Sequence, residues 1–354
     1  MDKNYAISLL SNKFNTLFNR IKSSIPSSFE KSFILLMDMK LWVFVLIGSV
    51  FFNSTAQTNS SDLISVSEIT LVVLGISQDA GSPQINCTKI CCKDAFEEKK
   101  KYNPVVSLGV IDPINKKQFL FEATPDIVLQ LRSLINNAPV EVDEIPAGIF
   151  LTHAHIGHYT GLMYFGKEAM NAYQVPVYVY PKMKSFLENN GPWSQLVSNQ
   201  NIQLKPMRKN KTVRLSSELR VQPFQVPHRD EFSETVGYKI MGSQKSALFI
   251  PDIDKWKKWD ISIIEAIKKV DYAFIDATFF SGAEIKARNI SEIPHPFVIE
   301  SIELFKDLSA EEKAKIFFIH LNHTNPLLKP ESQQSLEVES LGFGIARTGD
   351  RFSL

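Results

Sequence analysis

The sequence predicts an α/β fold in which helices cover two β-sheets. From residue 69 onward, short runs rich in β-branched and aromatic residues alternate with segments of helical periodicity. Histidine and aspartate recur directly after the apolar runs, at the sheet edge where α/β proteins assemble their sites. Residues 69–354 contain no internal repeat and no low-complexity linker, so we expect them to form one domain.

The strands are predicted from short apolar runs in which β-branched and aromatic side chains predominate. In chain order, they cover residues 69–74, 105–111, 118–122, 149–152, 177–180, 219–226, 236–240, 247–250, 272–275 and 315–319. The first helix is predicted to begin at Thr124 and Pro125, because a threonine N-cap often precedes a proline at the first helical position. The other helices cover roughly residues 181–189, 261–269, 296–308 and 330–341.

Residues 39–56 have the layout of a secretory signal peptide. The apolar stretch 41–52 is shorter than the span of about 20 residues that a transmembrane helix needs, and small residues follow it up to Ala56. We expect cleavage after Ala56, export to the periplasm or the medium, and no stable membrane span afterwards. We interpret 1–38 as a mis-assigned extension before a true start at Met39, and 57–68 as a short linker. An uncleaved signal that anchors the chain is the alternative.

The charge of the chain is close to balanced. Its net charge of +1 gives no reason to expect nucleic acid as a partner. Cleavage after Ala56 would remove six basic and three acidic residues, which leaves 33 basic against 35 acidic residues and a net charge of −2. We expect a small-molecule substrate, and the sequence leaves the oligomeric state open.

All three cysteines stand together, as Cys87, Cys91 and Cys92. An odd number of cysteines in an exported chain does not make a disulfide framework. Either one pair is oxidised and one thiol is left over, or all three bind a metal, although their spacing is not a standard zinc-knuckle spacing.

Three of the seven histidines, His153, His155 and His158, lie within six positions directly after a predicted strand. Neutral imidazole is the commonest metal ligand of proteins. Two histidines one residue apart can bind one ion, and the third can turn toward a neighbouring ion. Four further candidate ligands follow other predicted strands: His228, Asp252, Asp276 and His320. Because strand ends converge at the rim of an α/β fold, we predict a metal site assembled from distant parts of the chain.

These residues resemble the metallo-β-lactamase superfamily, whose hallmark is His-x-His-x-Asp-His followed by a distant His, Asp and His. Within that superfamily the chain looks most like the pyrroloquinoline quinone (PQQ) biosynthesis protein B group. The likeness is carried by residues 78–84, 151–162 and 320–326, and it extends over about residues 69–350. It implies a four-layer αβ/βα sandwich with the metal site in a cleft at one edge of the two sheets.

The resemblance also implies the roles of the ligands. His153, His155 and His228 would hold a first metal, His158 and His320 a second, and Asp252 would bridge the two. The cysteine-rich loop resembles a structural zinc site, which favours Cys87, Cys91 and Cys92 as ligands, although Cys91 is displaced from the expected pattern and no fourth ligand can be named. Zinc is the expected metal, in one or two active-site positions and one structural position. Iron and manganese are alternatives.

Gly157 departs from the hallmark, because it stands where the superfamily has aspartate. Glycine offers no side chain to a metal, so we expect weak or absent binding of the second metal. Water or a neighbouring carboxylate is the alternative ligand.

Four further side chains are assigned roles around the metals. Asp276 and His295 are predicted to supply or relay the proton that a leaving group needs. His323 and Asp79 are predicted to hydrogen-bond to the metal ligands. A helix-capping role for Asp276 and a surface position for His295 are the alternatives.

Three functions remain open from the sequence. The first is a metal-dependent hydrolase that uses metal-bound hydroxide to cleave an ester, lactone, amide or phosphodiester. The second is an accessory or oxidative role like that of the PQQ biosynthesis protein B group. The third is a protein that binds a metal or ligand without turnover. Since the six other ligand positions are retained, the third function is disfavoured, and we expect the first.

Overall fold

The structure, a computed structural model, describes residues 68–98, 102–229, 231–285 and 293–354. The predicted extension 1–38, the signal peptide 39–56 and the linker up to residue 67 lie outside the described residues. Within the described ranges, no helix combines the length and the apolar character that a membrane crossing requires.

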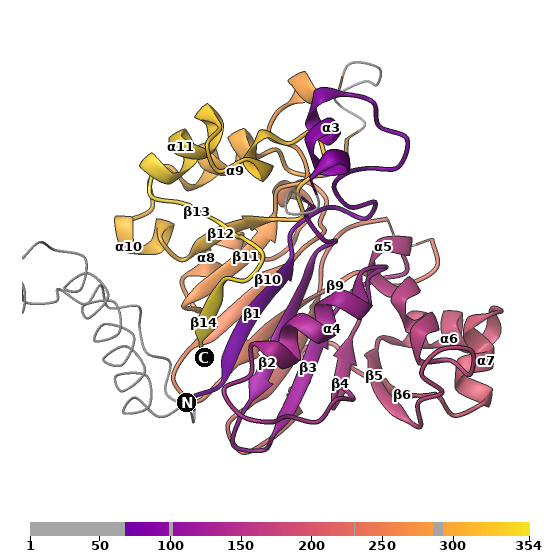
Figure 1. The fold of residues 1–354 in the computed structure, drawn as a ribbon. Helices are drawn as coiled ribbons and strands as arrows, with labels where there is room; N and C mark the ends of the chain where they lie inside the picture. The colour runs from indigo at the N-terminus through magenta and orange to yellow at the C-terminus, as the bar shows by residue number, and fades with distance from the viewer. Residues whose placement is uncertain (1–67, 99–101, 230, 286–292) are drawn as a thin grey trace, which may run out of the picture. The chain divides into compact units, whose positions relative to one another are not determined.

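The first of two β-sheets is formed by the N-terminal half of the domain and one C-terminal strand (Figure 1). Its strands lie in the order β14 (Arg351–Ser353), β1 (Thr70–Gly75), β2 (Ser107–Asp112), β3 (Lys117–Phe121), β4 (Gly148–Phe150), β5 (Val175–Val179) and β6 (Ile202–Pro206). The pairs from β14 to β3 are antiparallel, and those from β3 to β6 are parallel.

The second sheet is formed by the C-terminal half. Its strands lie in the order β13 (Gly344–Ile345), β12 (Ile316–Ile319), β11 (Tyr272–Asp276), β10 (Ser246–Ile250), β9 (Val236–Met241), β8 (Arg220–Gln225) and β7 (Val213–Arg214). Strands β10 to β13 run parallel, whereas β9 is antiparallel to both of its neighbours. The carboxyl ends of β8, β10, β11 and β12 therefore meet at one edge.

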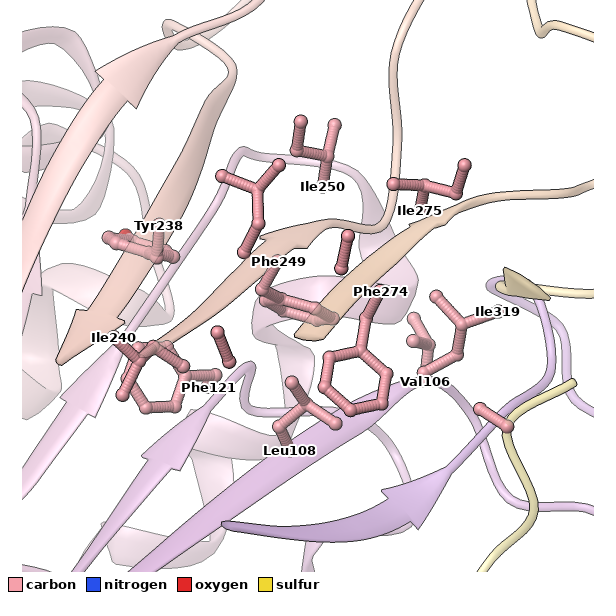
Figure 2. Packing of buried hydrophobic residues seen from close by; sticks show 14 of the residues in the cluster. Val106, Leu108, Phe121, Tyr238, Ile240, Phe249, Ile250, Phe274, Ile275 and Ile319 are labelled. Atoms are coloured by element: carbon pink, nitrogen blue, oxygen red, sulfur yellow. The ribbon is translucent and has the colours of Figure 1, made fainter. Parts of the chain in front are cut away.

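The main core lies between the two sheets. Phe121 of β3 meets Phe249 of β10 edge to face, with ring centroids 6.4 Å apart. Figure 2 shows Leu108 and Phe121 from the first sheet close to Phe249 and Phe274 from the second. All four side chains are fully buried, so they fix the two sheets against each other.

Helices cover the outer faces of both sheets (Figure 1). On the first sheet they are α4 (Ile127–Asn136), α6 (Pro181–Asn189) and α7 (Trp193–Ser198), and on the second α8 (Ile263–Ile267), α9 (Val298–Phe305), α10 (Ala310–Lys313) and α11 (Gln333–Ser340). Two short helices, α3 (Ile90–Glu97) and α5 (Ile156–Tyr159), follow loops at the carboxyl edge, and 3₁₀ turns cover Thr160–Phe165, Trp256–Lys258, Gly282–Glu284 and Pro326–Leu328. The predicted αβ/βα sandwich is confirmed.

The predicted start of the first helix is wrong by two residues. Helix α4 begins at Ile127, and Thr124 Oγ1 accepts a hydrogen bond from Asp126 N in the turn that precedes it. Pro125 therefore belongs to this turn rather than to the helix. Strands β7, β13 and β14 are only two or three residues long and carry no recognisable apolar run.

Candidate metal centre

Most of the polar side chains of the site lie at the ends of strands or shortly after them. His153 follows β4, His228 follows β8, Asp252 follows β10, and Asp276 is the last residue of β11. His320 follows β12. Strands β8, β10, β11 and β12 end at one edge of the second sheet, and the residues after β4 of the first sheet meet them there, as the sequence predicts.

The first cluster consists of His153, His155, His228 and Asp252. Oδ2 of Asp252 lies 3.2 Å from His228 Nε2 and 3.4 Å from His153 Nε2. His155 approaches the same oxygen through Nδ1 at 3.9 Å. The residues predicted to hold the first metal are therefore brought together around one carboxylate oxygen.

The second cluster consists of Asp79, His158, Asp252 and His320. Asp79 Oδ1 lies 2.7 Å from His158 Nε2 and 3.5 Å from His320 Nε2. His158 Nε2 in turn lies 4.0 Å from Asp252 Oδ2. Asp252 belongs to both clusters, which is the position that the sequence predicts for a bridging ligand.

Asp79 hydrogen-bonds to a predicted ligand, as expected, with its Oδ1 2.7 Å from His158 Nε2. Its carboxylate also lies among the ligand atoms of the second cluster, which the sequence did not predict. The expectation of a weak second site rested on the missing carboxylate at Gly157. The structure removes that reason, because a carboxylate from another loop lies in the cluster.

Unpartnered polar atoms show that the donor set fits a metal. Nε2 of His228, Nε2 of His320 and Oδ1 of Asp252 are buried and have no hydrogen-bond partner. His228 Nε2 is within 3.2 Å of Asp252 Oδ2 without the geometry of a hydrogen bond. Buried polar atoms without partners are costly, and cations in the two clusters would offer them partners. Imidazole and carboxylate together suit zinc, iron or manganese.

In four of the histidines, the Nδ1 atom on the other side of the ring from Nε2 contacts a side-chain oxygen atom. Nδ1 of His153 lies 2.8 Å from Thr152 Oγ1, and Nδ1 of His228 lies 3.3 Å from Asp254 Oδ1. The corresponding contacts are His158 Nδ1 to Glu122 Oε1 at 3.2 Å and His320 Nδ1 to Thr278 Oγ1 at 2.9 Å. In metal sites such contacts fix the ring orientation, so Nε2 of these four histidines is turned toward the centre.

Two residues at the centre adopt the left-handed backbone conformation that non-glycine residues rarely use. Glu122 has φ of +83° and His320 has φ of +66°. Both follow a strand and point a buried side chain at the clusters. Such strain tends to accumulate at functional sites, where the surrounding structure maintains it.

The charged groups of the site shift one another's pKa values in opposite directions. Although burial raises the pKa of Asp252, the charges of His228 and His295 hold it well below the usual value. Burial lowers the pKa of His228, but Asp252 and Asp254 outweigh burial and raise it to about 9. Burial also lowers the pKa of His158, which Glu122 and Asp79 nevertheless raise well above the usual value. The imidazole of His153 behaves differently, because burial lowers its pKa well below the usual value.

His295 and Asp276 form a pair beside the clusters. His295 Nδ1 lies 2.8 Å from Asp276 Oδ2 and 3.2 Å from Asp252 Oδ1. Thr278 donates its amide hydrogen to Asp276 Oδ1 at 2.9 Å. His295, Asp276, Asp252 and His320 also have ligand atoms close together, but the Nδ1 atoms that face Asp276 already have hydrogen-bond partners. We therefore interpret this group as a hydrogen-bond network.

The cysteines and His323 form a separate cluster. His323 Nδ1 lies 3.2 Å from Cys92 Sγ and 3.5 Å from Cys91 Sγ, and Cys91 Sγ lies 3.8 Å from Cys87 Sγ. All three cysteines are free. Four zinc ligands with Zn–S bonds of about 2.3 Å would stand roughly 3.8 Å apart, so these distances fit a tetrahedral Cys₃His site.

His323 is the main correction to the predicted site. We predicted that it would hydrogen-bond to the active-site ligands, but its ring lies beside the cysteines and supplies the fourth ligand atom that the sequence could not name. Its place three residues after His320 suggested the active site. His323 lies within a turn that Asn325 N closes onto Asn322 O, so it leaves the direction of the strand that ends before His320.

Comparisons with known proteins agree with this geometry. A family model described as the β-lactamase superfamily domain matches residues 117–321. Coenzyme PQQ synthesis protein B of Cupriavidus taiwanensis is 23% identical over 312 residues, which cover 80% of this chain and 99% of that protein. The protein of the same designation from Methylorubrum extorquens strain PA1 is 23% identical over 309 residues, with 79% and 98% covered.

Solved structures show the same fold. Zn²⁺-bound PqqB from Methylobacterium extorquens superposes with a TM-score of 0.67 at 21% identity, over 80% of this chain and 100% of that one. A diphosphatase from the PhnP family superposes with a TM-score of 0.57 at 20% identity, over 81% and 97%. The predicted metallo-β-lactamase fold and the resemblance to the PQQ synthesis protein B group are confirmed.

Proposed function

This chain belongs to the β-lactamase superfamily, and from that premise we propose that it is a metal-dependent hydrolase of a small-molecule ester, lactone, amide or phosphodiester. The observation that carries the proposal is the sharing of one carboxylate, Asp252, by two clusters of buried ligand atoms. The diphosphatase among its structural neighbours supports hydrolysis as the reaction class. The substrate is left open, because superfamilies of this kind vary it through their loops.

The proposed cofactor is zinc, held by the first and second clusters, with a further zinc among the cysteines. When bound, zinc supplies a Lewis acid and lowers the pKa of a water from about 16 to about 7. His153, His155 and His228 would hold it through neutral imidazoles, and Asp252 would be the only anionic ligand of the first cluster. Thr152 and Asp254 fix the rings of His153 and His228 through Nδ1, and this preorganises the site before a substrate arrives.

His295 is the residue that we propose as the proton donor to the leaving group. Burial lowers its pKa, but Asp276 and Asp252 raise the pKa well above the usual value, so the imidazole retains a proton at neutral pH. Its side chain is 10% exposed, which leaves part of the ring open to a ligand. Burial raises the pKa of Asp276, but His295 and His320 outweigh burial and lower it to about 2. Asp276 therefore orients His295 and is not itself the acid.

A substrate panel tests the proposal. The zinc-loaded full chain is assayed with esters, lactones, amides and phosphodiesters beside His153→Ala and the surface control Glu188→Gln on α6. We expect turnover of at least one class by the wild type and the control, and a loss of at least 100-fold in His153→Ala. Zinc binding without any turnover would favour the non-catalytic binding function instead.

A second candidate is an accessory or oxidative role in PQQ synthesis, which the designation of the curated relatives favours. Histidine and carboxylate ligands also suit iron. The discriminating experiment compares zinc-loaded with iron-loaded protein for oxygen uptake in the presence of quinone precursors. Oxygen uptake that requires iron and is lost in His153→Ala would favour this role over hydrolysis.

Export is a separate proposal that rests on residues 39–56 alone. N-terminal sequencing of the protein recovered outside the cytoplasm is expected to begin at Gln57. An intact Met1 or Met39 in that fraction would contradict cleavage.

A further inference from the structure

We propose that Asp79 is the anionic ligand of the second metal, in place of the hallmark aspartate at position 157, and that Gly157 is a glycine because Asp79 needs its space. This inference rests on the proposed function only in requiring that metal occupies the clusters. The carboxylate missing at position 157 is then replaced by a carboxylate from a different loop.

Backbone pairing places Asp79 beside His320. Gln78 N donates to Leu321 O at 2.9 Å, and Leu321 N donates to Ile76 O at 2.7 Å. The loop after β1 is therefore attached to the residue that follows His320. Gly81 N closes a turn onto Gln78 O at 2.7 Å, so Asp79 stands within a hydrogen-bonded turn and not on a free segment.

The side chain of Asp79 completes the donor set. Its Oδ1 lies 2.7 Å from His158 Nε2 and 3.5 Å from His320 Nε2, which has no hydrogen-bond partner. His158 already has Glu122 at its other ring nitrogen, at 3.2 Å. A role for Asp79 limited to pairing with His158 would leave the buried Nε2 of His320 unexplained. A metal between Asp79, His158 and His320 accounts for all three positions.

Gly157 is in contact with the backbone of Asp79. A Cβ atom at position 157 would lie 2.4 Å from Asp79 Cα and 2.9 Å from Asp79 O. These are backbone atoms of an anchored turn, so they cannot rotate away as the tip of a side chain would. An aspartate at 157 and Asp79 in its present place exclude each other. The second cluster therefore has room for one of these two carboxylates, and in this chain it comes from Asp79.

Counting bound zinc tests the ligand. The full chain is stripped, reconstituted with zinc and measured by elemental analysis and native mass spectrometry. We expect three zinc ions in the wild type and one fewer in Asp79→Asn and Asp79→Ala. The matched control is Asp112→Asn, which removes a buried carboxylate that bonds only locally to Asn115 and should keep all three.

Counting bound zinc also tests the glycine. Gly157→Ala removes no ligand, yet it should lose the same zinc, because its methyl group displaces the Asp79 turn. The control is Ile156→Ala in the same helix, whose side chain is 69% exposed and should be neutral. A variant that keeps the zinc at the cysteines is folded, because that site needs Cys92 and His323 together and they are 231 residues apart in the sequence.

The outcomes separate this inference from the proposed function. A wild type that binds zinc only at the cysteines would overturn both. If the wild type and Asp79→Asn both bind two zinc ions at the clusters, Asp79 is not a ligand. That result would leave the hydrolase proposal standing. Full zinc content in Gly157→Ala would overturn the role of the glycine.

Discussion

His295 and Asp276 meet at the edge of the second sheet, with Nδ1 of the imidazole 2.8 Å from Oδ2 of the carboxylate. Asp276 also accepts hydrogen bonds from Ile253 N and from Thr278, so its position is fixed from several sides. A carboxylate held in this way keeps the facing imidazole protonated and oriented. The pair therefore provides an acid next to the clusters.

Asp276→Asn should lower kcat at least tenfold with any substrate found in the panel, because general acids contribute about 10²–10⁴-fold. Loss of the facing carboxylate lowers the pKa of His295, which must be protonated to donate. The alkaline limb of the pH–rate profile should therefore move to lower pH. An unchanged limb would show that His295 is not the acid, and Asp112→Asn serves as the control.

Zinc uptake by the metal-free protein should release protons at pH 7. In the metal-free state the pKa of His228 is raised to about 9, so its imidazole is protonated at pH 7, whereas a zinc ligand must be neutral. The affinity of the first cluster should therefore rise with pH and level off near pH 9. Isothermal titration calorimetry in buffers of different ionisation enthalpy measures the release, and a binding enthalpy independent of buffer would contradict it.

The cysteine cluster should stabilise the fold. Its ligands join α3 to the loop after β12, so the loss of one ligand removes a tie between distant segments. Cys92→Ser and His323→Ala are each expected to lose one zinc and to lower Tm by roughly 5 °C or more, equivalent to about 2 kcal/mol. Both variants should keep the zinc at the Asp252 clusters. An unchanged Tm in zinc-loaded protein would exclude a structural role.

The interface between the sheets should dominate stability. Phe249 is fully buried against Phe121, so Phe249→Ala should lower the free energy of unfolding by about 3–5 kcal/mol. Phe232→Ala is the control, because its side chain is 63% exposed and should cost less than about 0.5 kcal/mol. Urea denaturation measures both, and equal costs would contradict the packing.

Local patterns in the sequence predicted an α/β fold with two sheets and a site at the strand ends, whereas the αβ/βα sandwich and the division of the ligands between two metals were implied by the family resemblance. His153, His228, Asp252 and His320 each follow an apolar run that is a strand, and the strand ends bring them together. The short edge strands were missed, because pairing with a neighbour defines β13 and β14 and apolar residues do not.

The roles of Asp79 and His323 depend on contacts that sequence spacing does not reveal. Asp79 reaches its cluster because the loop after β1 pairs with Leu321, more than 240 positions away in the printed sequence. His323 lies beside the cysteines because it belongs to the turn at residues 322–325, beyond the strand end that positions His320. One signal was available for Asp79. A glycine in place of a ligand indicates a close backbone approach, and the loop that approaches Gly157 is the one that carries Asp79.

A crystal structure of the zinc-loaded full chain, with anomalous scattering recorded at the zinc absorption edge, tests the central claim most directly. We predict two anomalous peaks on either side of the Asp252 carboxylate, one among His153, His155 and His228 and one among Asp79, His158 and His320. A third peak is expected among the cysteines and His323. The absence of any peak next to Asp252 would contradict the account.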